Sequence, residues 1–119
     1  MQNLKTNVLT ALQTATALSA LTGFYFQYPS NFTNLPCLSY FEVTNIGNLF
    51  ADDQEIGSEI IFQVDLWGKA SLSTYADAVG TAMSSIDFSR IYCTDLYDND
   101  SKIYHKAMRF RRDYSDPTF

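Results

Sequence analysis

Cysteine, histidine, proline and glycine are all scarce in this sequence, with two, one, three and five residues among 119. Two cysteines are too few for the framework of a disulfide-stabilised protein, and neither belongs to a C-x-x-C motif. We therefore expect Cys37 and Cys93 to be buried free thiols. The sequence also lacks the glycine-rich motif that cradles a phosphate group, so nothing in it indicates nucleotide chemistry.

Positive charge and long apolar segments are scarce as well. The chain has eight Lys and Arg against 13 Asp and Glu, which gives a net charge of −5 and a pI of about 4.5. An acidic protein is a poor binder of a nucleic-acid backbone, which requires a basic surface. No stretch approaches the roughly 20 apolar residues of a membrane span. Thr10, Thr14 and Thr16 interrupt the N-terminal apolar segment, which argues against a secretion signal.

Catalytic chemistry is poorly represented too. The single histidine, His105, lies within a predicted strand, where we expect a half-buried polar residue rather than a general base or a ligand. Cys93 and His105 belong to strands that pair in a predicted hairpin, but closeness alone does not make a nucleophile. We expect no enzyme activity, no cofactor and no metal site, and a hydrolase is the weakest of the alternatives.

The sequence is rich in aromatic residues, with nine Phe and eight Tyr, and its apolar fraction is 46%. This length and composition predict a single domain, residues 1–119, with one core. Aromatic residues favour strands and buried interfaces alike, and composition does not separate the two.

Apolar residues at three- and four-residue spacing predict two helices. The first covers Leu4–Leu21 within the N-terminal segment 1–22, and it ends before Gly23. The second begins at Ser71 or Ser73, because either residue is a suitable N-cap. Its apolar face is formed by Leu72, Tyr75, Ala76, Val79, Met83 and Ile86.

Five strands are predicted from aromatic, β-branched and alternating segments. They cover Phe24–Tyr28, Cys37–Thr44, Gly57–Trp67, Phe88–Tyr97 and Lys102–Arg112. The third strand alternates most regularly, and we expect one of its faces to contact the second helix. That face consists of Ile60, Phe62, Val64 and Leu66. The last two strands form a hairpin through the turn residues Asp98–Ser101.

Residues 45–56 contain Gly47, Asn48 and several acidic side chains, and we predict a long acidic loop there. Carboxylates at Asp52, Asp53, Glu55 and Glu59 suit a hard cation, but their spacing does not match a calcium-binding loop, and a solvated loop is the simpler interpretation. Residues 113–119 are predicted to form a short C-terminal tail. The order α-β-β-β-α-β-β then predicts an α+β fold, in which a mostly antiparallel sheet of four to five strands carries both helices on one face.

Three arginines, Arg109, Arg111 and Arg112, gather near the end of the last predicted strand. Arg109 and Arg111 are expected to project on the same side, because side chains alternate along a strand. The group is either a surface paired with carboxylates or a docking patch for an acidic neighbour.

The middle and end of the chain resemble the small tail completion (tail-terminator) proteins of siphophages. The resemblance is carried by Leu35–Tyr40 after Tyr28-Pro29, by Gln63–Gly68 at the end of a strand, and by Thr74–Val79 in a helix. A final hairpin with the aromatic and basic strand Lys102–Arg111 follows. The ordered set covers most of the chain. The long acidic loop and the short tail depart from the pattern, which leaves the identity of the partners open.

The resemblance implies a structural virion protein without enzyme activity. Such proteins form a ring, usually a hexamer, at the head-proximal end of the tail tube, where the ring stops tube polymerisation and meets the head connector. The implied partners are copies of the same chain, the tail tube protein and a head-completion or connector protein. DNA would pass through the ring without specific binding, since an acidic ring discourages adhesion. The implied location is the head–tail interface of the virion, after assembly in the bacterial cytoplasm and without a membrane.

The predicted loop also supplies a docking hypothesis. Leu49 and Phe50 lie beside Asp52, Asp53 and Glu55, so an apolar pair is expected to fill a pocket while the charges set the register. The three arginines are the candidates for the opposing charge. The alternative function is a small soluble binding or adaptor module that uses an aromatic surface, and such a module would be monomeric or dimeric.

Overall fold

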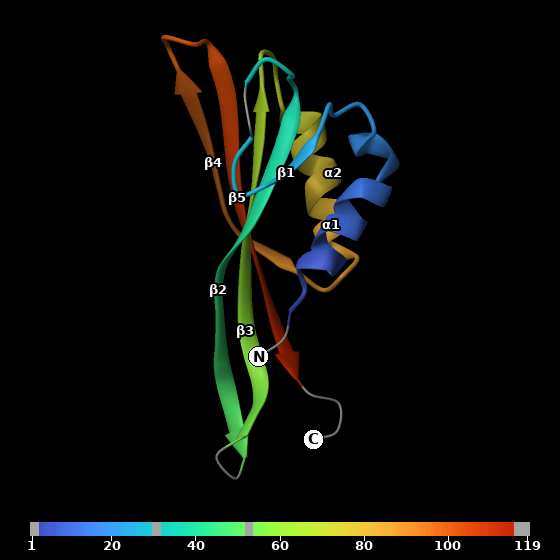
Figure 1. Cartoon of the computed structure of the whole chain (residues 1–119), viewed down its shortest axis with the longest axis vertical. Coiled ribbons are helices and arrows are strands. Elements are labelled where there is room, and N and C mark those ends of the chain that lie inside the picture. Colours follow the sequence, from blue (N-terminus) through green and yellow to red (C-terminus); the bar gives the residue numbers. More distant parts are fainter. Residues whose placement is uncertain (1–2, 30–31, 52–53, 116–119) are drawn as a thin grey trace.

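The computed structural model describes residues 3–29, 32–51 and 54–115, with the side chains of residues 48–51, 54–56 and 114–115 left outside the description. The chain is elongated, with extents of 54 × 28 × 22 Å (Figure 1). Its helices are α1 (Lys5–Thr14), a 3-10 turn (Thr16–Leu18) and α2 (Ser73–Ser84). Its strands are β1 (Phe24–Phe26), β2 (Cys37–Ala51), β3 (Gln54–Gly68), β4 (Ser89–Asp98) and β5 (Ile103–Ser115).

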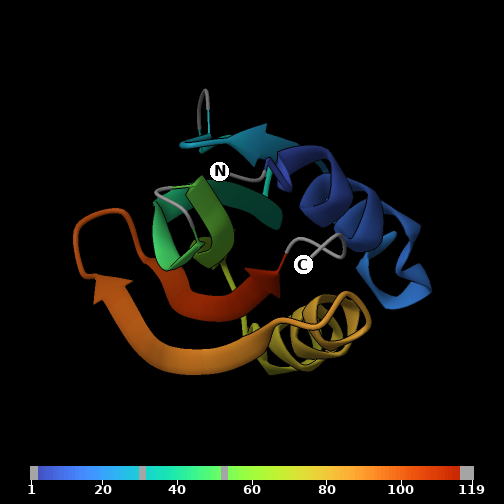
Figure 2. The same cartoon turned by 90° about the horizontal axis from the view of Figure 1, so that it is seen from below.

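The strands form one sheet in the order β1-β2-β3-β5-β4. β1 pairs in parallel with β2, and the other neighbouring strands pair antiparallel. Both helices lie against the same face of the sheet (Figures 1 and 2), which we call the helix face, and we call the other the opposite face. The predicted α+β class, the element order and the placing of both helices on one face are confirmed.

The core lies between the helices and the centre of the sheet. Alternate residues of β3 turn to the helix face and are fully buried, as their alternation predicted, and each contributes about 1.5–3 kcal/mol by burial. They join one cluster with apolar side chains of both helices and of β2 and β5. The fully buried members from β3 and the helices are Ile60, Phe62, Val64, Leu66, Val8, Leu12, Val79 and Met83.

The hairpin between β4 and β5 forms where the sequence predicted it. Lys102 adopts a φ of 58° and donates its backbone N–H to the carbonyl of Asp98 at 2.7 Å. The Asp98 carboxylate accepts hydrogen bonds from the Ser101 hydroxyl and the Asp100 N–H, and these bonds lower the pKa of Asp98. Local turn chemistry therefore closes this hairpin.

The loop predicted over residues 45–56 is wrong. Residues 45–51 continue β2 and residues 54–56 begin β3, so both belong to one long hairpin that extends beyond the helices (Figure 1). The ladder pairs Asn45 with Ile60 and Gly47 with Ser58, and register shifts near Val43 and Asn48 interrupt it. Pairing with β3 outweighs the low strand propensity of Gly and Asn, and one of the irregularities falls at Asn48.

The first helix is shorter than predicted. α1 ends at Thr14, because Ala15 turns to an extended backbone with a ψ of 114°. The Thr14 hydroxyl donates to the carbonyl of Thr10 at 2.8 Å, and such hydroxyls compete with the helical backbone. Leu18 and Leu21 are nevertheless buried, which explains why their spacing resembled the continuation of a helix.

Three smaller boundaries also differ from the predictions. Leu72 occupies the N-cap position of α2, so neither Ser71 nor Ser73 does, although the Ser71 hydroxyl accepts the Ser73 N–H at 3.4 Å. β1 ends at Phe26, because Gln27 adopts a φ of 69°. β5 continues through residue 115, so the first part of the predicted tail is strand, and residues 116–119 lie outside the described part.

Candidate assembly surfaces

Two of the C-terminal arginines lie on the opposite face, on the same side of β5 as predicted. Arg109 pairs across from Gln63 and donates from Nε to its Oε1 at 3.0 Å. Arg111 Nη2 lies 3.2 Å from Glu59 Oε2 and 3.2 Å from Asp113 Oδ1. Exposed ion pairs of this kind each contribute roughly 0–1 kcal/mol.

The third arginine projects to the other side of the sheet. Arg112 Nη1 donates to the carbonyl of Ile86 at 3.2 Å, and its Nη2 lies 3.9 Å from Asp87 Oδ2. Arg112 therefore ties the end of β5 to the segment that follows α2. The three arginines do not form one patch. Arg111 and Arg112 lie near carboxylates of the same chain, whereas Arg109 donates to the side-chain amide of Gln63.

The residues of the docking hypothesis belong to the far end of the long hairpin. Leu49 and Phe50 lie in β2, Glu55 lies in β3, and Phe50 and Glu55 are ladder partners. Asp52 and Asp53 lie outside the described residues. An apolar and acidic sequence thus occurs at the end of a projecting hairpin rather than in a free loop.

The hairpin end and the arginines are separated along β3. Arg112 is the ladder partner of Ile60, which is five positions from Glu55. Five strand positions span roughly 17 Å. The fold of one chain therefore does not bring Glu55 to the arginines, and any contact between these groups has to join different chains.

A polar network lies on the opposite face. Asp65 is 3% exposed; its two carboxylate oxygens accept Gln63 Nε2 at 3.0 and 3.2 Å, and its Oδ1 lies 2.7 Å from His105 Nε2. The His105 ring stacks on Trp67 with centroids 3.7 Å apart and planes 12° apart. Trp67 Nε1 donates to the buried Ser39 Oγ at 3.0 Å. Because its polar groups are partnered, this network orders the face.

Cys93 and His105 do not meet. Cys93 lies across from Met108 on the helix face, whereas His105 lies across from Leu96 on the opposite face. Cys93 is also exposed, so the prediction of two buried thiols is correct only for Cys37. The reason is the place of β4 at the edge of the sheet, which local sequence does not reveal.

The edge strand β4 carries apolar side chains that the chain leaves uncovered. Nine of its ten residues are exposed, and no strand pairs with its outer edge in the described part of the chain. Its large apolar residues occur as the adjacent pairs Ile91–Tyr92 and Leu96–Tyr97, with exposures between 45% and 51%. An unpaired apolar edge is a template for pairing with another chain. In the sequence, these adjacent pairs are the feature that could have indicated an exposed apolar edge, because neighbouring residues of a strand place apolar groups on both of its faces.

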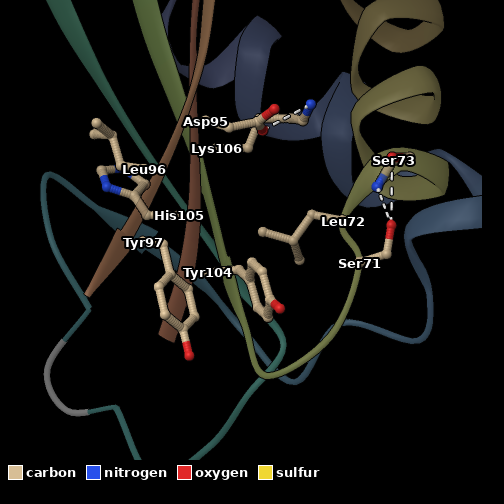
Figure 3. Close-up of a pocket in the computed structure, with 9 residues that line it drawn as sticks. All are labelled: Ser71, Leu72, Ser73, Asp95, Leu96, Tyr97, Tyr104, His105 and Lys106. Carbon is tan, nitrogen blue, oxygen red and sulfur yellow. Dashed lines mark hydrogen bonds and ion pairs between the residues drawn. The ribbon is translucent and has the colours of Figure 1, made fainter. Parts of the chain in front are cut away.

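Two hollows flank the end of this strand. One of about 370 Å³ lies on the helix face between β4, β5 and the start of α2, where Tyr97 and Tyr104 stand side by side (Figure 3). The other, of about 420 Å³, is lined on the opposite face by Phe32 and Trp67 among others. Leu96 and Tyr97 line both hollows, so this part of the edge is open on its two sides.

Two further observations concern metals and membranes. Among the residues that the structure describes, no group of three or more His, Cys, Asp and Glu side chains is arranged to hold a metal ion. No helix within the described ranges has both the length and the apolar character needed to cross a membrane.

Comparisons with known proteins identify the family of this chain. The model of the family "Tail completion protein gp17" matches residues 6–114, which include nearly every helix and strand described above. In fold, the chain is similar to a chain in the structure of the virion of a native gene transfer agent particle, with a TM-score of 0.61 and 17% identity over 87% of this chain and 88% of that one. No curated protein sequence matches the chain. The chain thus belongs to the tail completion protein gp17 family and is a structural component of a phage-type tail.

Proposed function

We propose that this chain forms a closed ring at the head-proximal end of a phage-type tail, where it completes the tail and joins it to the head connector. The observation that carries the proposal is the β4 edge, which exposes nine of ten residues in a protein of a tail completion family. A closed ring covers such an edge in every copy, because the edge of each subunit meets a different surface of the next.

The expected ring is a homo-hexamer in contact with the tail tube protein and a head-completion or connector protein. The net charge of −5 suits a ring through which DNA passes, since like charge discourages adhesion of the polymer. Assembly would take place in the bacterial cytoplasm, and the ring would remain in the virion at the head–tail interface. No catalytic step is part of this function.

Deletion of the gene tests the proposal in the cell. Without the chain, we expect unjoined heads and tails with overlong tubes, and a plasmid copy should restore joined particles in electron micrographs. Native mass spectrometry of the ring released from purified tails should give six copies of the chain. Particles that join normally without the chain would contradict the proposal. A chain that is only monomeric or dimeric and absent from tails would favour the adaptor module instead.

The hairpin end is proposed to dock on the tail tube or on a neighbouring subunit. Replacing both Leu49 and Phe50 with Ser should abolish tail joining while far-UV circular dichroism remains unchanged. Charge reversal at Asp52 and Asp53 should weaken association and make it less sensitive to salt, because attraction to Arg109, Arg111 and Arg112 would be lost. The matched control replaces the exposed Ala17 and Ala20 with Ser, away from the hairpin, and should join tails normally.

A further inference from the structure

The sheet has a second unpaired edge, on the side away from β4. β1 pairs with β2 only at Leu38–Tyr40, so from residue 41 to residue 51 no strand of the described part of the chain pairs with the side of β2 that faces away from β3. This edge spans eleven residues and β4 spans ten, so their lengths match. Six of the nine large apolar side chains that are described as exposed lie on these two edges. They are Val43, Ile46, Ile91, Tyr92, Leu96 and Tyr97.

We propose that β4 of one copy pairs with residues 41–51 of β2 in the next copy, so that one sheet continues from subunit to subunit. The inference rests on the ring proposed above and specifies its contact. The two edges differ, and a contact between different surfaces of identical chains is the type that generates rings. Three antiparallel pairings lead from β2 through β3 and β5 to β4, so β2 and β4 run in opposite directions. A rotation that places one edge beside the other therefore gives an antiparallel pair.

The side chains on the opposite face set the register. There, β4 presents Tyr92 and Leu96 on either side of Thr94, and both large side chains are 50% exposed. The β2 edge presents Ile46, which is 55% exposed and pairs across from Glu59 on the same face. If Ile46 lies opposite Thr94, it fills the gap between Tyr92 and Leu96, since diagonal neighbours on adjacent strands are within reach of large side chains.

The same register gives contacts on the helix face. Tyr97, which is 45% exposed, comes to lie beside Val43, next to a hollow of about 260 Å³ whose lining includes Lys5 and Phe26. Phe26 is itself 47% exposed, so the two aromatic rings cover each other. Asp98, the last residue of β4, falls one position short of the part of β2 that β1 occupies. The incoming strand thus fits without displacing β1.

The stagger between the two edges is compatible with closure. Through the ladders of the sheet, Thr94 is level with Asp65 of β3, whereas Ile46 is level with Glu59. These two β3 residues are six positions apart, so each copy is displaced by roughly 20 Å along the strands relative to the next. The four strands of one copy are together about 19 Å wide. Because the displacement and the width are nearly equal, the strands tilt about 45° from the ring axis, close to the tilt of roughly 35–45° that closed sheets adopt.

A disulfide between copies tests the pairing. The register places Gly47 of one copy opposite the native Cys93 of the next, and opposed residues of an antiparallel pair have Cα atoms about 4.5–5.5 Å apart, which suits a disulfide. No glycine in the described part has a positive φ, so the backbone accepts Gly47→Cys. Within one chain β3 and β5 separate β2 from β4, so a bond between these positions has to join two copies. Tails that carry Gly47→Cys should therefore give, after mild oxidation, a ladder of covalent oligomers that reduction removes.

The chain offers matched controls. Ile46→Cys lies one residue away on the opposite face and should give no ladder with Cys93, and Gly47→Cys combined with Cys93→Ser should give none either. Cys37 does not compete, because burial raises the pKa of its thiol to about 11. A ladder from Gly47→Cys alone supports the pairing. An equal ladder from Ile46→Cys, or no ladder in tails that contain the chain, overturns the pairing and leaves the ring standing. Heads and tails that join without the chain overturn the proposed function, and the pairing with it.

A second variant measures the apolar contact directly. Leu96→Lys changes a half-exposed side chain, so circular dichroism should remain that of the parent, but incorporation into tails should fall about tenfold or more because the charge is buried in the contact. Ser84→Lys, at an exposed position at the end of α2, adds the same charge away from both edges and should be incorporated normally. Normal incorporation of Leu96→Lys would overturn the pairing.

Discussion

β3 and β4 belong to one sheet and are both rich in apolar residues, yet they have opposite surroundings. From residue 57 to residue 68, no residue of β3 is exposed, whereas nine of the ten residues of β4 are. β3 lies in the centre, with the helices on one face and a stacked polar network on the other. β4 lies at the edge, where no strand of the described chain covers its outer side. Apolar content alone therefore does not distinguish these two strands, and position in the sheet decides whether the apolar side chains are covered within the chain or left exposed.

The largest expected effect on stability compares one aromatic residue from each strand. Phe62 of β3 is fully buried, so Phe62→Ala should lower the free energy of unfolding by about 3–5 kcal/mol. Tyr92 of β4 is 50% exposed, so Tyr92→Ala should change it by less than about 1 kcal/mol in dilute solution. Chemical denaturation monitored by circular dichroism measures both values. Similar losses for the two variants would show that β4 is covered within the chain.

The next largest effect compares two carboxylates that each pair with a basic residue. Asp65 of β3 has a side chain 4% exposed and pairs with His105, whereas Asp95 of β4 is 80% exposed and pairs with Lys106 at 2.9 Å. Asp65→Ala should cost about 1–3 kcal/mol, because it leaves the half-buried Gln63 and His105 side chains without their acceptor. Asp95→Ala should cost less than about 1 kcal/mol, and the cost should shrink with added salt.

Urea midpoints at low and high salt separate these two cases. Asp65→Asn serves as the control for shape, since it keeps the side-chain volume and one acceptor oxygen. A cost for Asp65→Ala no greater than that for Asp95→Ala would mean that the network on the opposite face does not stabilise the sheet.

The sequence predicted what local patterns determine. The alternation of β3 identified the buried face, and the spacing of Leu72, Val79 and Met83 identified the face of α2 that packs on it. Turn residues identified the hairpin after Asp98, because their conformations are set by neighbours in the chain. These features depend on a few consecutive residues, so a single sequence contains them.

What was missed depends on pairing between distant segments. Gly47 and Asn48 indicated a loop, but the register with β3 makes residues 45–51 a strand. Cys93 was expected to be buried, because nothing in Ser89–Asp98 reveals that this strand lies at an edge. The arginines were correctly placed on a strand, but their partners on β3 and in the segment after α2 became visible only in the folded chain. The candidate assembly surfaces follow from the order of strands, which is a non-local property.

The smallest expected effect compares the two thiols. Cys37 is fully buried against Trp67 and Ile103, whereas Cys93 is exposed on β4. Cys37→Ala should cost about 1 kcal/mol through lost packing, and Cys93→Ala less than about 0.5 kcal/mol. A thiol reagent at pH 8 should label one cysteine in the folded chain and two in denaturant. Assembly should remain intact in both variants, and labelling of two thiols in the folded chain would contradict the burial of Cys37.

The burial of Cys37 also predicts how stability depends on pH. Burial raises the pKa of its thiol from the usual 9.0 to about 11, so the folded state holds this proton over a range in which the unfolded chain has released it. Below about pH 9 both states are protonated and the thiol contributes no pH dependence. Between about pH 9 and 11 the unfolded state binds fewer protons, so the free energy of unfolding falls as the pH rises.

Urea denaturation of the parent, of Cys37→Ala and of the control Cys93→Ala across this range isolates the contribution of Cys37. Cys37→Ala lacks this contribution, and Cys93→Ala retains it. Parallel pH profiles for all three chains would mean that the thiol of Cys37 ionises as readily in the folded protein as in the unfolded one.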